Sequence, residues 1–256
     1  MRPIPLSVLK QLTLPSRRSH KGQNGALYIV AGSKQYHGAL LYAILAAEHF
    51  VDLIYVETDP SNRAAVRSLK GLHPAIILVS PKQRTQYLTK SDCLLLGPGL
   101  GKSARTKALV RTVLIHQHRP AATVVDADAL HYIESTWINA GTILTPHPGE
   151  MRPEFETDHH SGVILKKGTK VIICQGTNCR YNTSGIARQT KGGLGDLLAG
   201  LTAALACTNP PYRAACAASL LLSRTVVRLQ RQRGTFVTTR LIPEQLPLTL
   251  KRYLPS

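Results

Sequence analysis

The chain has 256 residues, of which 43% are hydrophobic, and this is enough for one large α/β domain or two smaller ones. Its 32 Lys and Arg against 14 Asp and Glu give a formal net charge of +18, which favours anionic partners such as nucleotides, dinucleotide phosphates, RNA or acidic lipid. No apolar run approaches the roughly 20 residues of a membrane span, and residues 1–10 lack the apolar core of a signal peptide, so no membrane partner is expected and the cytoplasm is the expected location.

Short apolar runs alternate with helical patterns from residue 27 onward, which predicts β-α units and a mostly parallel sheet. The runs are continuous rather than alternating, as is typical of strands covered on both faces. A helix is expected over 40–47, after the first strand. The predicted strands are 27–30, 53–56, 75–79, 93–96, 123–125, 142–144 and 163–165.

The pattern changes after residue 170. Residues 171–174 and 179–182 are strand-like and flank a polar turn at 175–178, which predicts a β-hairpin. Two long helices are then expected, over 196–207 and 212–230, with Pro210 and Pro211 between them. In open parallel sheets the ligand crevice lies outside the carboxyl ends of the strands, so we expect the motifs that follow the strands to converge on one edge.

The strongest motif is Lys191-Gly192-Gly193-Leu194-Gly195-Asp196, directly before an apolar helix. Glycines let several N–H groups point at one place, and the start of a helix attracts anions. Asp196 could simply be an N-cap, but the three glycines before it favour a functional role. As a general base, it would take a proton from a substrate hydroxyl while the amides hold a transferring phosphoryl group.

Three further turns carry weaker signals. Gly97-Pro98-Gly99-Leu100-Gly101 follows a predicted strand and is either a plain β-α turn or a place where a ligand approaches the main chain. His147 stands between two prolines that stiffen its turn and aim its side chain, which favours a ligand contact over a structural role. The turn from Gly32 to Ala39 opens the first helix and is ambiguous with an ordinary turn.

Charged residues follow two other predicted strands. Asp126 and Asp128 could hold Mg²⁺ through water or cap the next helix. Lys166-Lys167-Gly168-Thr169-Lys170 could bind nucleotide phosphates or form a solvated turn. Neither motif decides between its alternatives on its own.

Two groups of residues are interpreted as structural. The arginines at 224, 228 and 231 follow helical spacing, so we expect one solvated helix face and no nucleic-acid partner, because few aromatic residues accompany them. The five cysteines are odd in number and form no Cys-x-x-Cys pair, so buried free thiols are expected and neither a disulfide nor a metal role is. They are Cys93, Cys174, Cys179, Cys207 and Cys216.

Taken together and in this order, these motifs resemble the NAD(P)H-hydrate dehydratases, whose dehydratase domain is ribokinase-like. The resemblance covers nearly the whole chain. It implies a ribokinase-like three-layer α/β/α fold with a mostly parallel central sheet and a C-terminal β-hairpin, as a single domain over residues 1–256 without a fused epimerase domain. It rests on the segments 19–22, 31–33, 36–39, 97–101, 124–130, 145–150 and 193–196.

By this resemblance, the chain repairs hydrated NADH or NADPH: it phosphorylates the ring hydroxyl and eliminates phosphate, with Mg²⁺ and either ADP, as in most bacterial members, or ATP, as in eukaryotic ones. Asp196 would be the catalytic base at the ring. A homo-oligomer, such as a tetramer, is implied, and no metal ligand is assigned. The implied substrate contacts are Ala39, Gly99, Gly101, His147 and Asp196, and the implied nucleotide contacts are Lys166, Lys167, Gly168, Thr169, Lys170, Gly193 and Gly195.

The chain departs from the family pattern on the nucleotide side. Leu194 stands where the family has Thr or Ser, and Lys167 stands where it has Gly. Residues 185–188 replace a Gly-Asn-Pro-Gly segment, and the stretch between Glu150 and Val163 is shorter than usual. Arg188 and Lys191 are candidates for compensating by charge.

Two alternatives remain open. One is a small-molecule kinase of the same superfamily, of the hydroxymethylpyrimidine or thiazole type, which would leave a stable phosphorylated product. The other is a non-catalytic protein that holds nucleotide or RNA on its basic surface. Its binding would fall steeply with salt and would not respond to Asp196→Asn.

Overall fold

A ten-stranded sheet forms the centre of the protein, in the order β1-β10-β9-β8-β7-β6-β5-β2-β3-β4. The computed structural model describes residues 1–156, 160–183 and 191–254. The strands are β1 (Arg2–Pro3), β2 (Ala26–Val30), β3 (Leu53–Glu57), β4 (Ile76–Leu78), β5 (Cys93–Leu96), β6 (Ala122–Val125), β7 (Thr142–Leu144), β8 (Val163–Lys166), β9 (Val171–Gln175) and β10 (Asn178–Asn182). The helices are α1 (Ser7–Lys10), α2 (Gly38–Ala47), α3 (Arg63–Leu72), α4 (Arg84–Leu88), α5 (Ala104–Leu114), α6 (Leu194–Ala206), α7 (Pro211–Arg233) and α8 (Gln245–Leu250).

The seven strands β2 to β8 are mutually parallel, as the sequence predicts, and β9 runs antiparallel to both β8 and β10. Every expected strand forms, with ends that agree or differ by one residue. The hairpin is tighter than expected, because β9 and β10 extend to Gln175 and Asn178 and leave only Gly176 and Thr177 in the turn. The mostly parallel sheet and the C-terminal hairpin are therefore confirmed.

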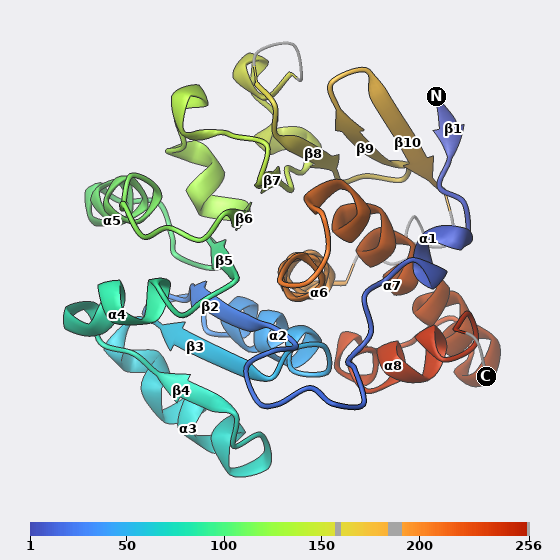
Figure 1. The fold of residues 1–256 in the computed structure, drawn as a ribbon, viewed down its shortest axis with the longest axis horizontal. Helices are drawn as coiled ribbons and strands as arrows, with labels where there is room; N and C mark the ends of the chain where they lie inside the picture. The colour runs from blue at the N-terminus through green and yellow to red at the C-terminus, as the bar shows by residue number, and fades with distance from the viewer. Residues whose placement is uncertain (157–159, 184–190, 255–256) are drawn as a thin grey trace.

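Two hydrophobic cores lie on opposite faces of the sheet, which gives three layers (Figure 1). Along β2, Leu27 and Ile29 point into one core, while Tyr28 and Val30 point into the other. The first core contains α2, α6 and α7, and the second contains the apolar side of α5. Continuous apolar strands are required here because both faces are covered.

The disulfide prediction was wrong for two of the five cysteines. Cys174 and Cys179 lie opposite each other in the β9–β10 register and form a disulfide. The two-residue turn brings their Cα atoms to 4.2 Å. Cys93 and Cys216 are buried free thiols, as expected, and Cys207 is a partly buried one.

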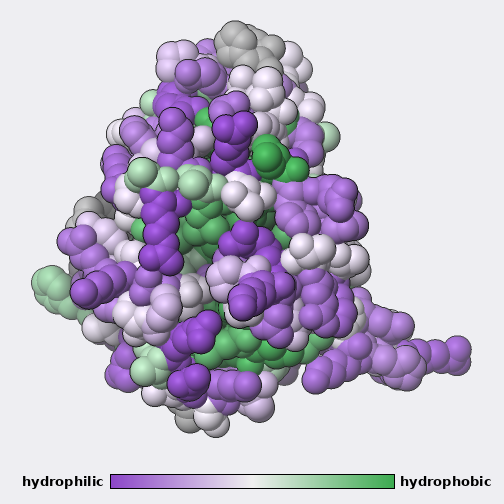
Figure 2. Space-filling view, turned by 90° about the vertical axis from the view of Figure 1, so that its left-hand side faces the viewer, coloured by the Kyte–Doolittle hydropathy of each residue, from purple (hydrophilic) through white to green (hydrophobic). Residues whose placement is uncertain are grey.

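The surface is rich in charge, but the arginines of α7 are not a uniformly solvated face. Arg231 is exposed, whereas Arg224 and Arg228 are half-buried, and Arg228 Nη1 donates to Thr249 Oγ1 of α8 at 3.4 Å. The packing of α8 against α7 accounts for this difference. On the side of α4 and α5, hydrophilic side chains cover most of the surface, and hydrophobic atoms show mainly in the recesses between them (Figure 2).

No helix in the described parts of the chain combines the length and the apolar character needed to cross a membrane.

Candidate active site

The predicted motifs meet at one edge of the sheet, beyond the carboxyl ends of the parallel strands. A cavity of about 480 Å³ lies there, between the turn after β2, the turn after β5, the turn after β6 and the start of α6. Ala39, Gly99 and Asp196, three residues singled out from sequence, line it together. The remaining lining residues are Gln35, Tyr36, His37, Gly38 and Asp128.

Asp196 lies in the first turn of α6 and is half-buried. Gly193 occupies the N-cap, so the alternative interpretation of Asp196 as the capping residue is wrong. Burial, followed by the charge of Asp126, raises the pKa of Asp196 to about 6, although Lys167 acts in the opposite direction. A carboxyl group with a pKa near neutrality is suited to accept a proton at physiological pH.

Lys167 and Asp126 form a buried ion pair at the base of the site. Lys167 Nζ lies 2.7 Å from Asp126 Oδ1 and 3.9 Å from Glu150 Oε2. Asp126 also accepts a hydrogen bond from Thr145 Oγ1 at 2.6 Å. Burial lowers the pKa of Lys167, but the charges of Asp126, Glu150 and Asp196 outweigh it and the pKa is raised. The ammonium group therefore stays charged at neutral pH.

Lys167 lies close to the start of α6, as its distance from Gly195 shows. A Cβ atom built at Gly195 would lie 3.7 Å from Lys167 Nζ, so the ammonium group approaches the first turn of α6. The positive end of the helix and this cation are thus adjacent. Together they form a place where the charge of a transferring phosphoryl group would be stabilised.

Glycines bring the surrounding turns into contact. Gly193 has a φ of 90°, and a Cβ atom there would lie 2.4 Å from the ring of Tyr42 on α2. Gly99 has a φ of 65°, and a Cβ atom there would lie 3.0 Å from Ala39 Cβ. Gly101 donates its backbone N–H to Asp128 Oδ2 at 2.7 Å. Gly193 and Gly99 therefore permit close packing between neighbouring segments of the chain, whereas the approach of a ligand to these glycines stays a prediction.

The other predicted contacts, in the turns after β7 and β8, do not line this cavity. His147 is exposed, lies outside the cavity lining, and accepts a hydrogen bond from the Gly149 backbone through Nδ1 at 3.4 Å. In the lysine turn, Lys166 and Thr169 are exposed, and Lys170 Nζ lies 4.0 Å above the ring of Tyr181 on the hairpin. Gly168 is half-buried. Of these lysines, Lys167 is the one that points into the site.

Three residues near the site were not given a role from sequence. Tyr36 and His37 line the cavity, and Glu150 lies beside Lys167. All three belong to motifs noted in the sequence, so position within a motif was the available signal. The departures at 185–188, including Arg188, lie outside the described residues, and Lys191 is exposed.

A magnesium ion would fit this site only together with a nucleotide. Within residues 1–156, 160–183 and 191–254, no group of three or more His, Cys, Asp or Glu gathers closely enough to hold a metal. Asp126 is already occupied by Lys167 and Thr145. Asp128 and Glu150 are two further carboxylates of the site, and each accepts a backbone hydrogen bond through one oxygen. Mg²⁺ commonly binds through one or two carboxylates and the phosphates of a substrate.

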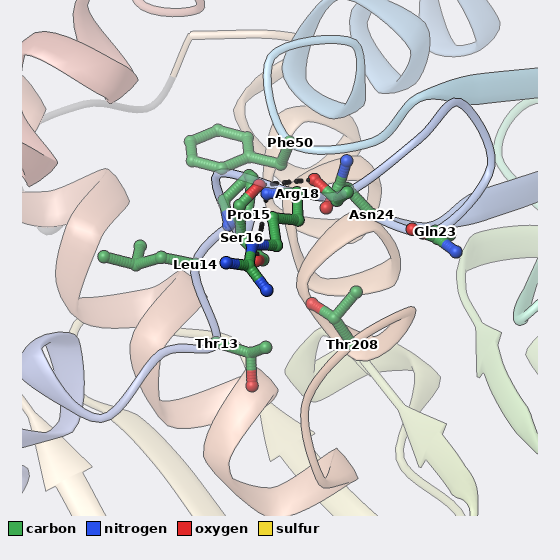
Figure 3. Close-up of a pocket in the computed structure, with 10 residues that line it drawn as sticks. Thr13, Leu14, Pro15, Ser16, Arg18, Gln23, Asn24, Phe50 and Thr208 are labelled. Carbon is green, nitrogen blue, oxygen red and sulfur yellow. Dashed lines mark hydrogen bonds between the residues drawn. The ribbon is translucent and has the colours of Figure 1, made fainter.

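A second pocket, of about 320 Å³, lies at the opposite edge of the sheet (Figure 3). Its lining includes Asn24, just before β2, and Thr208, just after α6, and Figure 3 shows Arg18 between them and Phe50. It has no carboxylate in its lining and lies at the amino ends of the strands. Both features set it apart from the cavity around Asp196.

Solved structures share this fold over nearly the whole chain. A ribokinase-like superfamily protein from Enterococcus faecalis superposes with a TM-score of 0.86 at 23% identity, covering 99% of this chain and 96% of its own. An ADP/ATP-dependent NAD(P)H-hydrate dehydratase from Bacillus subtilis, crystallised with ATP and Mg²⁺, superposes with a TM-score of 0.80 at 22% identity, covering 98% of each chain. The fold and the site thus define a ribokinase-like α/β protein with a candidate phosphoryl-transfer centre.

The sequence comparison is more specific. A family model described as NAD(P)H-hydrate dehydratase matches residues 27–248, and the chain belongs to that family. A bifunctional NAD(P)H-hydrate repair enzyme from Methanocaldococcus jannaschii is 32% identical, over 95% of this chain and 51% of its own length. An ADP-dependent (S)-NAD(P)H-hydrate dehydratase from Listeria monocytogenes is 30% identical, over 93% of this chain and 92% of its own. The chain spans about half the length of the archaeal bifunctional relatives.

Proposed function

We propose that the chain dehydrates hydrated NADH or NADPH back to the coenzyme, with ADP or ATP as the phosphate donor. The observation that carries this proposal is Asp196, whose pKa is raised to about 6, in a cavity that it shares with Ala39 and Gly99 at the start of α6. The Listeria monocytogenes relative, which matches over 92% of its length, is named for this activity.

The chemistry divides into two steps. In the first, Asp196 accepts the proton of the ring hydroxyl while the hydroxyl oxygen attacks the terminal phosphorus of the nucleotide. The nucleotide, shortened by one phosphate, leaves. In the second, the phosphate departs from the ring carbon, the adjacent carbon loses a proton, and the ring double bond of NAD(P)H is restored. Phosphate is a far better leaving group than hydroxide, which is why a nucleotide is consumed.

Lys167 and the N-terminus of α6 serve the first step. Both are positive and adjacent, so they stabilise the charge that develops on the phosphoryl oxygens. Mg²⁺ arriving with the nucleotide would neutralise further phosphate charge, with Asp128 or Glu150 as its protein contacts. Gly99 lets its turn pack closely against Ala39 and Tyr36, which brings the turn after β5 to the edge of the cavity where the dinucleotide would bind.

The test is the recovery of NADH from chemically hydrated NADH, followed at 340 nm with Mg²⁺ and either ADP or ATP. We expect nucleotide-dependent recovery in the wild type and its loss in Asp196→Asn. A stable phosphorylated hydrate without NADH would indicate a kinase. Folded wild-type protein that recovers no NADH with either nucleotide would overturn the proposal in favour of a binding protein.

Assembly as a homo-oligomer and a cytoplasmic location belong to the same proposal and are supported by the family resemblance. Light scattering after size exclusion gives the mass in solution. A mass of 27.9 kDa, that of one chain, would contradict the oligomer.

A further inference from the structure

A further cavity, of about 490 Å³, lies beside the candidate active site at the same edge of the sheet. One wall is the turn after β2, which contains Gly32 and Lys34, and another is the turn after β3, which contains Asp59. The first two turns of α5 close the third side and contribute Arg105. Two motifs noted in the sequence, the turn from Gly32 to Ala39 and the segment 97–101, contribute to its lining, but neither was given a role at this place.

The base of the cavity is held by a fixed charge pair. Arg84 Nε donates to Glu57 Oε2 at 2.9 Å, and the same oxygen accepts the hydroxyl hydrogen of Tyr28 at 2.8 Å. Glu57 is 5% exposed and Tyr28 is fully buried. Because Arg84 is committed to Glu57, it forms part of the wall, and a ligand would have to be recognised by the more exposed charges.

Those exposed charges are Lys34 and Arg105. Both side chains lie at the solvent-facing side of the cavity, and that of Arg105 is 84% exposed. Arg105 Nη1 is 3.8 Å from Asp59 Oδ2, so a single loose ion pair leaves most guanidinium donors available. These two cations face one half-buried carboxylate, that of Asp59, so the charge of the cavity mouth favours an anion. A phosphate group fits, because the Arg105 guanidinium can bind it through two parallel hydrogen bonds and the Lys34 ammonium can bind it as a point charge.

The two cavities are joined by buried hydrogen bonds. Asn62, which is 1% exposed, donates through Nδ2 to the carbonyl of Ser33 at 3.2 Å and pairs through Oδ1 with His37 of the active-site cavity. Gly32 N–H donates to the carbonyl of Pro98 at 2.8 Å. The connection after β2 therefore lies between the two cavities and is hydrogen-bonded both to Asn62 and to the turn after β5.

The strand order places this cavity on the side of Asp196 that is away from the nucleotide. The lysine turn follows β8, whereas the further cavity lies over β2 and β3, at the other side of β5 and β6. The connection after β2 lines both cavities, with Gly32, Ser33 and Lys34 in the further cavity and residues 35–39 in the active-site cavity. A dinucleotide with its nicotinamide ring at Asp196 therefore has to cross only this connection to enter the further cavity.

We propose that this cavity binds the adenosine end of the dinucleotide and that Lys34 and Arg105 contact the 2′-phosphate that distinguishes NADPH from NADH. The inference rests on the proposed function for the position of the nicotinamide ring. The volume of the cavity lies within the range of small-molecule sites, about 300 to 1,000 Å³. Asp59 then faces the ribose, and Arg105 turns from Asp59 to the phosphate.

The kinetic test compares hydrated NADPH with hydrated NADH in Lys34→Ala, Arg105→Ala and the double variant. We expect the ratio of kcat/KM for the phosphorylated over the unphosphorylated substrate to fall about tenfold in the double variant. Lys107→Ala is the matched control, because Lys107 is an exposed cation of α5 that does not line the cavity. A ratio that stays as in the wild type, or that falls equally in Lys107→Ala, would overturn the inference.

A binding measurement separates this inference from the proposed function. Calorimetry with 2′,5′-ADP and with 5′-AMP, at saturating ADP to fill the nucleotide turn, needs no turnover. We expect 2′,5′-ADP to bind more tightly than 5′-AMP in the wild type and in Asp196→Asn, and the preference to vanish in the Lys34/Arg105 double variant. If 2′,5′-ADP binds more tightly than 5′-AMP but no NADH is recovered, the inference about the cavity is supported and the proposed dehydratase activity is contradicted. If NADH is recovered but the two ligands bind equally, only the inference about the cavity is overturned.

Discussion

Lys167 Nζ lies 2.7 Å from Asp126 Oδ1, and this ion pair connects the turn after β8 to the turn after β6 beneath the start of α6. Asp126 is 1% exposed, so the pair is removed from solvent and each charge depends on the other. Lys167 also lowers the pKa of Asp196, against the burial that raises it. One cation thus stabilises a buried carboxylate, faces the phosphoryl position and tunes the proposed base.

Replacing this cation should affect activity and stability together. In Lys167→Met, we expect kcat/KM for nucleotide-dependent NADH recovery to fall about 100-fold or more, because a preorganised charge at the phosphoryl group is lost. The free energy of unfolding should fall by about 3 kcal/mol, since Asp126 is left buried and unpaired. Urea denaturation followed by circular dichroism measures the second effect.

The neighbouring lysine gives the control for stability. Lys166 is exposed on the same turn, so Lys166→Met should leave the free energy of unfolding within about 0.5 kcal/mol of the wild type. Equal destabilisation by both variants would contradict a specific Lys167–Asp126 pair. Unchanged activity in Lys167→Met would contradict its phosphoryl role.

The pKa of Asp196 predicts the acid limb of the activity. The base must be ionised to accept a proton, and its pKa is raised to about 6. We therefore expect kcat/KM to decline tenfold per pH unit below about 6 and to level off above it. A decline of kcat/KM that begins only near pH 4 would show that Asp196 is not the titrating base. As a control, a coupled enzyme assay of added NADH at each pH excludes its loss by acid.

The same pKa predicts a gain in stability on neutralising Asp196. Its carboxyl is protonated more readily in the folded chain than in the unfolded one, where the ordinary value is 3.8, so stability falls as pH rises from about 4 to 6. Asp196→Asn should therefore be more stable than the wild type at pH 7.5 by about 1–2 kcal/mol, after allowance for partial exposure. The difference should disappear at pH 3.5, and thermal unfolding at the two pH values measures it. A difference of the same size at both would indicate a packing effect.

The sequence predicts the strands well and the chemistry of the site less well, for a physical reason. Strands such as Cys93–Leu96 and Thr142–Leu144 are continuous apolar runs, because helices cover both faces of the sheet. The role of Lys167, by contrast, depends on Asp126 and Thr145, which follow other strands and meet it only in the folded chain. Local pattern therefore left a phosphate-binding turn and a solvated turn as equal alternatives, and it did not indicate the ion pair with Asp126.

The same distinction applies to the second cavity and to the hairpin. Lys34, Arg105 and Asp59 come from three separate connections, and no spacing in the sequence relates them. Cys174 and Cys179 flank a turn that was predicted, so their opposition across two strands was within reach of the pattern. Counting cysteines without that register led to the wrong expectation.

Gly193 predicts a sharp steric effect. It adopts a φ of 90°, and a Cβ atom would lie 2.4 Å from the Tyr42 ring. Gly193→Ala should lower the free energy of unfolding by about 2–3 kcal/mol, from the strained backbone and the overlap together. Gly192→Ala is the control, because nothing lies within 4 Å of the added atom and no positive φ is required there. Urea titrations of both variants decide it: similar losses would contradict the contact with Tyr42.

The disulfide between Cys174 and Cys179 predicts a redox-dependent thermal stability of the protein. The bridge closes a short loop, with a sequence separation of 5, so reducing it should cost about 2 kcal/mol on the chain-entropy estimate. We expect the Tm of the wild type to fall by several degrees with a strong reductant, and the Tm of Cys174→Ser/Cys179→Ser to be the same with and without it. Cys93 and Cys216 remain in that variant as buried thiols, so they serve as an internal control for effects of the reductant on other cysteines. A wild-type Tm that ignores the reductant, with mass spectrometry showing both thiols free beforehand, would contradict the bridge.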